Sequence, residues 1–493
     1  MLRSNGMGPD QTNSAADVLV ALAPGLGTLR RRLEDALLEG IVSGRLAPGT
    51  ALPPSRALAD ALGISRWVVT ETYGHLVGKG ILEARTGAAT RVSATARAGA
   101  AADVRRAETP RPERAPRRAE HDLAPGVPDL RHVPREAWVR AVRDALAGAT
   151  NQDLGGQPPA GHPAARTAVA THLRRARVVA GGDAAVVLTR GATDGMSRVA
   201  VALAAAGHTH LLVEDPSWAP LRDVAAAAGL VPVPVPVDDD GVSADRLRAA
   251  AARTGARAVL LTPAHQFPLG AVLSDDRRAA VVDWAREVDG LVVEDDYDAE
   301  FRYDRRPVPA LQGLDPDRVL LLGSTSKTLA PAFGIGWMAV PERWRAAVLE
   351  ASVRRGPSPG PATVDQLALA RFLGDGSYAR HLRAARTRYS RRRAALLAAL
   401  DEALPGARVG GIAAGMHVTV DLAGVRLDGG HPPDAAAVVR EAAAREVAVA
   451  DLRRYQAVPP ARSTTLVVGY GNLADARVGA AVRGLRAAVL AAR

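Results

Sequence analysis

Residues 321–327 read Leu-Leu-Gly-Ser-Thr-Ser-Lys, an apolar run that ends in three hydroxyl-bearing residues and a lysine. Lys79 and Lys327 are the only lysines among the 63 basic residues of the chain. A lysine retained against such a bias is a candidate for chemistry closed to arginine, because guanidinium stays protonated and cannot form a Schiff base. The stretch therefore predicts a strand that delivers a reactive amine beside hydroxyl groups able to bind phosphate.

The sequence around this stretch has the pattern of an α/β domain. From about residue 121 to 493, apolar strands alternate with Ala-rich amphipathic helices. The predicted strands are 185–188, 210–214, 231–237, 258–262, 291–294, 319–322 and 337–340. The predicted helices are 193–206, 217–228, 243–254 and 275–288. Because proline cannot donate a hydrogen bond, we expect the strand VPVPVPV at 231–237 to lie at a sheet edge or beside a bend.

Two other strand ends carry groups that complement the lysine. Asp295 ends the strand 291–294, 32 residues before Lys327, and Tyr297 follows it. A carboxylate can pair with a protonated pyridine nitrogen, and a phenol can hydrogen-bond to a ring oxygen. The run LTRGATDGM (188–196) turns from a strand into a helix start, where backbone amides can bind an anion. Each feature alone is common, but their order at strand ends of an α/β sheet predicts a site for pyridoxal 5'-phosphate (PLP).

The N-terminal part has the pattern of a winged helix-turn-helix. Residues 28–43 place Leu29, Leu33, Leu37 and Ile41 on one helical face, and helices at 53–62 and 66–78 flank a turn at 63–65. Ser65 is placed to cap the third helix, from which Arg66, Thr70 and Tyr73 project. Residues 80–92 predict two short wing strands. The alternative is a three-helix bundle used for dimerisation. We expect Lys79 to be a solvated or phosphate-facing charge.

Composition divides the chain into four segments: a disordered tail (1–25), the winged helix-turn-helix (26–92), a flexible linker (93–120) and the α/β domain (121–493). Residues 1–120 hold 17 basic and 12 acidic residues, so the net charge of +11 is denser there than elsewhere, as expected for a nucleic-acid partner. The absence of cysteine excludes disulfides, thiolate chemistry and Cys-ligated metals. No apolar run reaches the ~20 residues of a membrane span, so we expect a soluble, cytoplasmic protein.

Residues 46–82 (LAPGTALPPSRALADALGISRWVVTETYGHLVGKGIL) resemble the winged helix-turn-helix of GntR-family bacterial regulators. The resemblance implies binding to double-stranded DNA. The residues that it places at the DNA, together with the projecting Tyr73, are Ser55, Arg56, Ser65, Arg66, Thr70, Tyr73, Arg85 and Thr90. The wing departs from the family pattern, because Gly87-Ala88-Ala89-Thr90 stands where members often have Gly-Ser-Gly-Thr.

Residues 121–493 resemble fold-type-I aminotransferases, and most closely the aminotransferase-like half of MocR/GabR-type regulators. TPAHQFPLGAVLS (262–274) and the run from Val293 to Trp337 carry this resemblance. It implies a large PLP-binding part at about 175–350 and a small part at about 121–150 plus 356–493. It implies Lys327 as the Schiff-base lysine, Asp295 as the pyridine partner and Tyr297 as the donor to the ring oxygen. The other cofactor contacts that it implies are Ala192, Thr193, Ser324 and Ser326 at the phosphate, Trp218 at the ring face, and His265 or Gln266 near the ring hydroxyl.

Two positions depart from that family. Gly334 replaces the usual phosphate-binding arginine seven residues after the lysine, and Gly156 replaces a phosphate-contacting tyrosine. At about 0.5–3 kcal/mol for each lost bond, PLP affinity is expected to fall by about two to three powers of ten. Arg462 and Arg453 are the candidates for binding an effector carboxylate.

The expected protein is a homodimeric, DNA-binding transcriptional regulator that binds PLP through a Schiff base and senses an amino compound or PLP itself. No metal site, no membrane partner and no catalytic role are expected. Two alternatives remain open: a PLP-dependent aminotransferase with an accessory DNA-binding domain, and a PLP-free dimeric regulator with a degenerate pocket. The expected fold class is multidomain, an α+β winged helix-turn-helix followed by an α/β fold-type-I domain.

Overall fold

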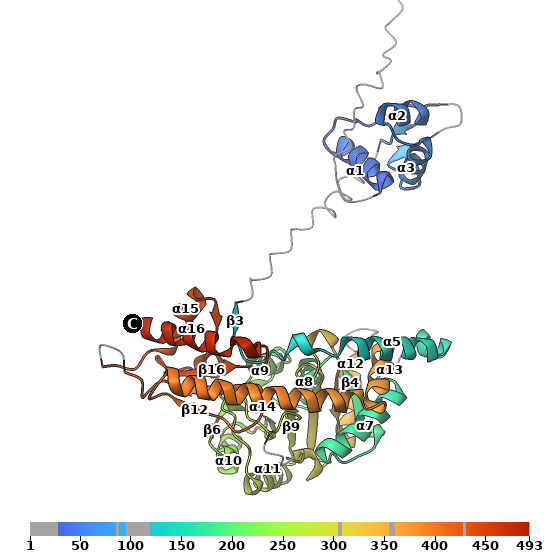
Figure 1. Ribbon diagram of the computed structural model, residues 1–493. Coiled ribbons are helices and arrows are strands. Elements are labelled where there is room, and N and C mark those ends of the chain that lie inside the picture. Colours follow the sequence, from blue (N-terminus) through green and yellow to red (C-terminus); the bar gives the residue numbers. More distant parts are fainter. Residues whose placement is uncertain are drawn as a thin grey trace, which may run out of the picture. The chain divides into compact units, whose positions relative to one another are not determined.

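The computed structural model describes residues 28–84, 88–94, 119–156, 158–303, 308–353, 360–426 and 430–492. It divides into two compact units, Met1–Arg117 (unit 1) and Arg118–Arg493 (unit 2), each drawn in Figure 1. The tail expected at 1–25, and the linker expected at 93–120 apart from its first and last two residues, lie outside the described residues. Within the described ranges, none of the helices has the length and apolar character needed to cross a membrane.

Unit 1 has the three helices and two wing strands that the sequence predicts. They are α1 (Leu29–Val42), α2 (Ser55–Leu62), α3 (Arg66–Gly78), β1 (Leu82–Glu83) and β2 (Arg91–Val92). The two strands pair antiparallel, with Leu82 opposite Val92. Gly63 ends α2 in the left-handed conformation (φ 63°), and the Ser65 side chain accepts a hydrogen bond from Val68 N to begin α3. A left-handed glycine followed by a serine cap therefore makes the tight turn between the two helices.

The core of unit 1 is formed by the apolar faces of its helices. Leu33, Leu37 and Ile41 of α1 are buried as predicted, whereas Leu29 is 43% exposed at the first helical position. Lys79 is exposed, in line with the prediction of a solvated charge, and it also has a partner that the sequence did not predict. Its Nζ lies 2.9 Å from Oε1 of the buried Glu34, so this lysine joins the end of α3 to α1.

Unit 2 is built on an eight-stranded sheet in the order β4-β11-β10-β9-β8-β5-β6-β7. Pairing is parallel from β10 through β9, β8 and β5 to β6, whereas β11 and β7 pair antiparallel with their neighbours. Its strands are β4 (Val186–Thr189), β5 (His210–Asp215), β6 (Val231–Asp238), β7 (Gly241–Val242), β8 (Ala258–Leu261), β9 (Leu291–Asp296), β10 (Val319–Ser324) and β11 (Gly336–Ala339). The predicted α/β strands are thus confirmed. Of the strands described, the two-residue β7 alone lies beyond β6, so the Pro-rich strand lies near the sheet edge, as predicted.

Helices cover both faces of this sheet, which explains why its strands are apolar at successive positions. Leu320 and Leu322 pack with α8, α9 and α12 on one face, while Val319 packs with α10 and α11 on the other. On that second face, α7 lies against β4 and β11. These helices are α7 (Pro163–Arg177), α8 (Ala192–Ala205), α9 (Ala219–Ala227), α10 (Ala244–Thr254), α11 (Asp275–Glu287) and α12 (Glu342–Val353).

A second layer of unit 2 contains a four-stranded antiparallel sheet in the order β12-β13-β16-β15. Its strands are β12 (Arg408–Gly410), β13 (His417–Asp421), β15 (Ala450–Asp451) and β16 (Thr465–Gly469). Its buried residues share one core with α14, the long orange helix in Figure 1, and with α16. The remaining helices and strands are α5 (Arg135–Gly148), α6 (Asn151–Gly155), α13 (Thr363–Gly374), α14 (Ser377–Ala403), α15 (Ala435–Ala444), α16 (Val478–Ala491), β3 (His121–Asp122) and β14 (Val447–Ala448).

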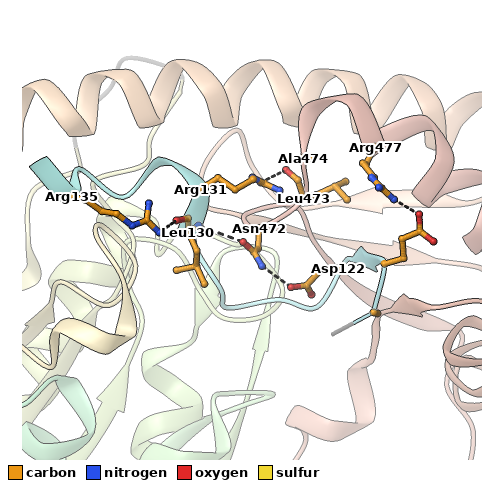
Figure 2. A pocket seen from close by; sticks show the side chains of 10 residues that line it. Asp122, Leu130, Arg131, Arg135, Asn472, Leu473, Ala474 and Arg477 are labelled. Atoms are coloured by element: carbon orange, nitrogen blue, oxygen red, sulfur yellow. Dashed lines mark hydrogen bonds and ion pairs between the residues drawn. The ribbon is translucent and has the colours of Figure 1, made fainter. Parts of the chain in front are cut away.

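The first residues of unit 2 are fastened to its last part. Strand β3 pairs parallel with β14, and Asp122 accepts a hydrogen bond from Asn472 Nδ2 at 2.9 Å. Figure 2 shows how the side chains of this region meet: Arg131 Nη2 donates to Leu473 O at 2.7 Å, and Arg477 forms an ion pair with Glu120. The segment that follows the linker is therefore held in place before it reaches the large sheet.

Candidate functional site

The site is assembled by the register of two neighbouring parallel strands. Leu322 of β10 lies opposite Asp295 of β9, so the turn that carries Lys327 and the strand end that carries Asp295 lie side by side. Gly323 is required here, because a Cβ on it would lie 2.2 Å from Nε1 of Trp337 on β11. Strand order thus places Lys327 near Asp295, as the sequence predicted.

A cavity of about 410 Å³ opens at these strand ends. Eight of the ten predicted cofactor residues line it: Lys327, Asp295, Tyr297, Ala192, Thr193, Ser324, Ser326 and Trp218. His265 and Gln266 do not appear in its lining. The cavity is also lined by residues for which the sequence predicted no role, among them Gly126, Arg190, Asp298 and His417. A pocket of this size, with a few convergent polar groups, has the dimensions of a cofactor site.

Lys327 is held inside this cavity by backbone and aromatic groups. Its Nζ donates a hydrogen bond to the carbonyl oxygen of Gly126 and lies 5.9 Å from the centre of the Trp218 ring. Burial lowers the pKa of the lysine, although Asp298 and Asp295 act in the opposite direction. A lowered pKa increases the share of neutral amine, the form that attacks an aldehyde.

Asp295 is the clearest sign that the cavity fits PLP. The residue is 7% exposed, and its Oδ1 is buried with no hydrogen-bond partner among the described residues. Burial, with a smaller contribution from Asp296, raises the pKa of Asp295 to about 7. A buried acid without a donor is costly, and a pyridinium N–H placed in the cavity would supply both the donor and the positive charge.

Tyr297 belongs to a buried polar cluster with His265 and Asp298. Nδ1 of His265 lies 2.8 Å from Oδ2 of Asp298 and 3.0 Å from the hydroxyl of Tyr297. Burial raises the pKa of Tyr297 well above its usual value, so the phenol stays protonated. His265 therefore contacts a residue of the cavity lining, Tyr297, rather than lining the cavity itself.

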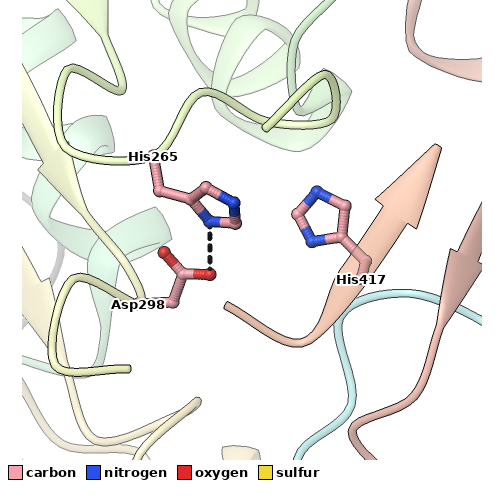
Figure 3. A group of neighbouring side chains, drawn as sticks. All are labelled: His265, Asp298 and His417. Carbon is pink, nitrogen blue, oxygen red and sulfur yellow. Dashed lines mark hydrogen bonds and ion pairs between the residues drawn. The ribbon is translucent and has the colours of Figure 1, made fainter. Parts of the chain in front are cut away.

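His265, Asp298 and His417 also form a group that could ligate a metal (Figure 3). One ligand atom from each lies within 4.8 Å of the others. His417 Nε2 donates to Pro268 O at 3.1 Å, and burial lowers the pKa of His417 to about 3, so its ring is neutral. In the structure described, the Asp298–His265 bond orients Tyr297, and we assign the cluster that positioning role.

Three other predicted residues lie away from the cavity. Gln266 is buried, and its Nε2 donates to the carbonyl oxygens of Pro216 and Phe267, both at 2.8 Å, which gives it a structural role in its loop. Arg453 Nη2 pairs with Asp451 at 2.8 Å, and Arg462 is exposed. Neither arginine lines the cavity, so the structure does not bring them to Lys327.

The first turn of α8 also lines the cavity. Gly191 caps this helix with φ 115°, and the amides of Ala192 and Thr193 occupy its first two positions, where helix N–H groups lack intrahelical partners. The Oγ of Ser326 would lie 4.0 Å from a Cβ on Gly191, so hydroxyls and amides converge there. This arrangement supplies amide and hydroxyl donors that suit a phosphate.

Gly334 and Gly156, the two positions that depart from the family pattern, have no side chain that could contact a phosphate. Gly334 has φ 58°, and a Cβ on it would have no described atom within 4 Å, while Gly156 is exposed at the end of α6. Neither glycine lines the cavity. Any cationic contact to a phosphate must therefore come from elsewhere in the chain.

In unit 1, the predicted DNA-contacting residues gather where α2 and α3 begin. Arg66 Nε donates to Ser55 Oγ at 3.3 Å, and Thr70 Oγ1 donates to Arg66 O at 3.0 Å. Arg56, Ser65, Arg66 and Thr70 are exposed, and Ser55 is half-buried. The two helix starts thus form one polar surface with two arginines.

The other predicted contacts of unit 1 are placed differently. Tyr73 is 7% exposed and its hydroxyl donates to Pro53 O at 3.0 Å, so it packs inside the unit. Thr90 is half-buried before β2, and Arg85 lies outside the described residues. Trp67, for which the sequence predicted no role, is 67% exposed beside Arg66.

Two family models match the chain, in the order of its two units. The model of the bacterial regulatory proteins of the gntR family matches residues 29–92, and that of aminotransferase class I and II matches residues 121–464. Among solved structures, Pyrococcus horikoshii kynurenine aminotransferase shares the fold with a TM-score of 0.65 at 22% identity, covering 75% of this chain and 90% of that one. A mutant of Thermus thermophilus aspartate aminotransferase gives 0.64 at 23% identity, covering 74% and 96%.

Three relatives that match most of this chain are regulators by name. The pyridoxine biosynthesis transcriptional regulator PdxR of Corynebacterium glutamicum is 32% identical, over 82% of this chain and 86% of that protein. The probable rhizopine catabolism regulatory protein MocR of Rhizobium meliloti is 33% identical over 75% and 76%, and the transcriptional regulator TauR of Rhodobacter capsulatus is 32% identical over 77% and 81%. The chain therefore belongs to the MocR-type subfamily of GntR-family transcriptional regulators, in which a helix-turn-helix domain precedes a fold-type-I aminotransferase domain.

Proposed function

We propose that this protein regulates transcription by binding double-stranded DNA through unit 1 and PLP through Lys327 of unit 2. The observation that carries the proposal is the placement of Lys327 Nζ in a cavity with the unpartnered Oδ1 of Asp295. PLP supplies an aldehyde that condenses with primary amines, which makes an amino compound or PLP itself the effector. The PdxR relative, whose name refers to pyridoxine biosynthesis, favours PLP itself.

Different residues of the cavity would bind different parts of such a ligand. Asp295 accepts a hydrogen bond from the protonated ring nitrogen, and Tyr297, positioned by His265, donates a hydrogen bond to the ring oxygen. Trp218, which packs edge-on against Phe267 at 5.5 Å, offers a flat face to the ring. Ser324, Ser326 and the amides of Ala192 and Thr193 bind the phosphate.

The hydrogen bond from Lys327 to Gly126 offers a route from the cavity towards the linker. Gly126 lies on the segment between β3 and α5, and this segment is fastened at Asp122 and Arg131. When the lysine amine is used to hold a ligand, Gly126 O loses its donor, and the loop must find another arrangement. Because the same segment continues into the linker, the change is transmitted to the point where unit 1 is attached.

On the DNA side, the proposal rests on the polar surface at the starts of α2 and α3. Arg56 and Arg66 supply positive charge, and Ser55, Ser65 and Thr70 supply hydroxyls. A homodimer would present two such surfaces to two half-sites. Val139 and Leu146 of α5 are each 53% exposed and are apolar residues available for a dimer contact.

The test combines a spectrum with a DNA-binding assay. Purified protein titrated with PLP should develop an absorbance band that Lys327→Ala abolishes, and borohydride reduction should leave the cofactor mass on the peptide that contains Lys327. An unmodified Lys327 after saturation with PLP would overturn cofactor binding.

The second candidate function is that of an aminotransferase, because unit 2 has the fold of these enzymes. A regulator should bind operator DNA in a salt-dependent manner and show little or no amino-group transfer to a keto acid. Rapid transfer, together with a lack of sequence-specific DNA binding, would favour the enzyme.

A further inference from the structure

Arg190 lines the ligand cavity at the end where α8 begins. It follows the last residue of β4 and precedes Gly191, the cap of α8. The residue is exposed, and its Nε donates to the carbonyl oxygen of Gly360 at 3.2 Å. The bond to Gly360 fixes the direction of the guanidinium, a planar group with five N–H donors.

Two side chains that carry positive charge line the cavity, those of Lys327 and Arg190. Lys327 lies near Asp298 and Asp295, which both act to raise its pKa. Gly191, the residue after Arg190, lies near the hydroxyl of Ser326, because a Cβ on it would be 4.0 Å from Ser326 Oγ. Arg190 therefore lies at the part of the cavity that holds the α8 amides and Ser326.

The acid in the first turn of α8 is balanced by a second arginine. Oδ2 of Asp194 accepts the backbone N–H of Arg190 at 3.0 Å and lies 2.6 Å from Nη2 of Arg198. Arg198 is 1% exposed, so the ion pair is buried along α8. Because Arg198 balances Asp194, the first turn of α8 keeps the positive character of a helix N-terminus.

We propose that Arg190 binds the phosphate group of the ligand and supplies the guanidinium that position 334 lacks. The inference rests on the proposed function, since it concerns how the same cavity holds PLP. A phosphate monoester carries about −1.5 to −2 charge at pH 7, more than helix amides and neutral hydroxyls balance. Arg190 adds a full positive charge and planar N–H donors that suit phosphate oxygens.

The experiment compares two aldehydes that differ only in the phosphate. Full-length protein is titrated with PLP and, separately, with pyridoxal, and each affinity is read from the absorbance band that depends on Lys327. Arg190→Ala should weaken PLP binding by about 10- to 100-fold and change pyridoxal binding by less than about twofold. Arg190→Lys should recover part of the loss, because it restores charge without the planar donors. Inorganic phosphate should compete with PLP in the wild type and much less in Arg190→Ala.

Arg174→Ala is the matched control, since Arg174 is an exposed arginine on α7 that does not line the cavity. It should leave both affinities unchanged. An equal loss of PLP and pyridoxal binding in Arg190→Ala would overturn the inference, because the effect would then be structural. Unchanged PLP affinity would overturn it as well. A wild type that binds neither aldehyde would instead overturn the proposed function, and the role of Arg190 with it.

Discussion

Replacing Asp295 with asparagine should stabilise unit 2 in the absence of PLP while weakening its affinity for PLP. Burial raises the pKa of Asp295 from 3.8 to about 7, a difference that corresponds to about 4 kcal/mol at about 1.4 kcal/mol per pH unit. Because the folded protein holds the proton more tightly, stability falls as pH rises from about 4 to about 7 and levels off above that. The asparagine variant lacks this penalty.

The size of the gain depends on pH. An asparagine amide still buries polar atoms, at a cost of about 1–3 kcal/mol, so Asp295→Asn should gain about 2 kcal/mol at pH 8. At pH 5 the penalty in the wild type is only about 1.6 kcal/mol, and the two proteins should be nearly equal. Urea unfolding followed by tryptophan fluorescence reports mainly on unit 2, because Trp67 is the only one of the six tryptophans in unit 1.

The same variant should bind PLP about 30- to 1000-fold more weakly, because it loses a buried charge pair that is worth about 2–4 kcal/mol. Asp239→Asn, at an exposed position on the turn after β6, is the control and should change neither property. A stability change that is the same at pH 5 and pH 8 would refute the assignment of the raised pKa to Asp295. Unchanged PLP affinity would refute its role as the ring partner.

Three further outcomes follow from contacts elsewhere in the chain. Arg392→Met should lower the unfolding free energy by about 3–5 kcal/mol in urea titrations, because it removes the buried ion pair to Asp129, 2.7 Å from Arg392 Nη2, and the bonds to the carbonyl oxygens of Tyr470 and Gly471; a loss under 1 kcal/mol would contradict this. Tyr73→Phe should cost about 1 kcal/mol in the melting of unit 1 through the lost bond to Pro53 O, with operator affinity unchanged; weaker DNA binding in a fully folded variant would show that its hydroxyl meets DNA. Arg66→Ala should reduce operator affinity by about 1–3 kcal/mol in fluorescence anisotropy and flatten its salt dependence; an unaltered isotherm would exclude α3 from the interface.

The sequence predicted the strands of the large sheet because both of their faces are buried. A strand such as β10 has apolar residues at every position from Val319 to Leu322, which separates it from the amphipathic helices around it. The ends of these strands could be predicted as well, because the first polar residue after an apolar run marks the point where the strand leaves the buried core. Asp295 and Ser324 were found in this way.

The missing parts of the site come from segments whose position no local pattern reveals. Gly126, which accepts the hydrogen bond of Lys327, lies in a loop 201 residues before it in the sequence. His417 lies on a strand of the second sheet. Their roles depend on tertiary packing, which periodicity does not encode. Asp298 was closer to being found, because it ends the acidic run Glu294-Asp295-Asp296-Tyr297-Asp298. The ion pair of the exposed Lys79 was missed for a related reason, because its partner Glu34 lies on a different helix.

Two buried acids of unit 2, Asp295 and Glu214, differ in how their carboxylate oxygens are used. Burial raises the pKa of Glu214, as it does that of Asp295, to about 7. Glu214 accepts hydrogen bonds from the backbone and side chain of Thr262, at 3.0 and 2.5 Å, so its oxygens are used within the fold. Asp295 keeps a buried Oδ1 without a donor in the described part of the chain. The shifted pKa is common to both and does not separate them, whereas Asp295 has an unpartnered buried oxygen and also lines the cavity. Glu214→Gln should therefore disturb folding without a selective effect on PLP, and a PLP-specific loss in a fully folded Glu214→Gln variant would contradict this distinction.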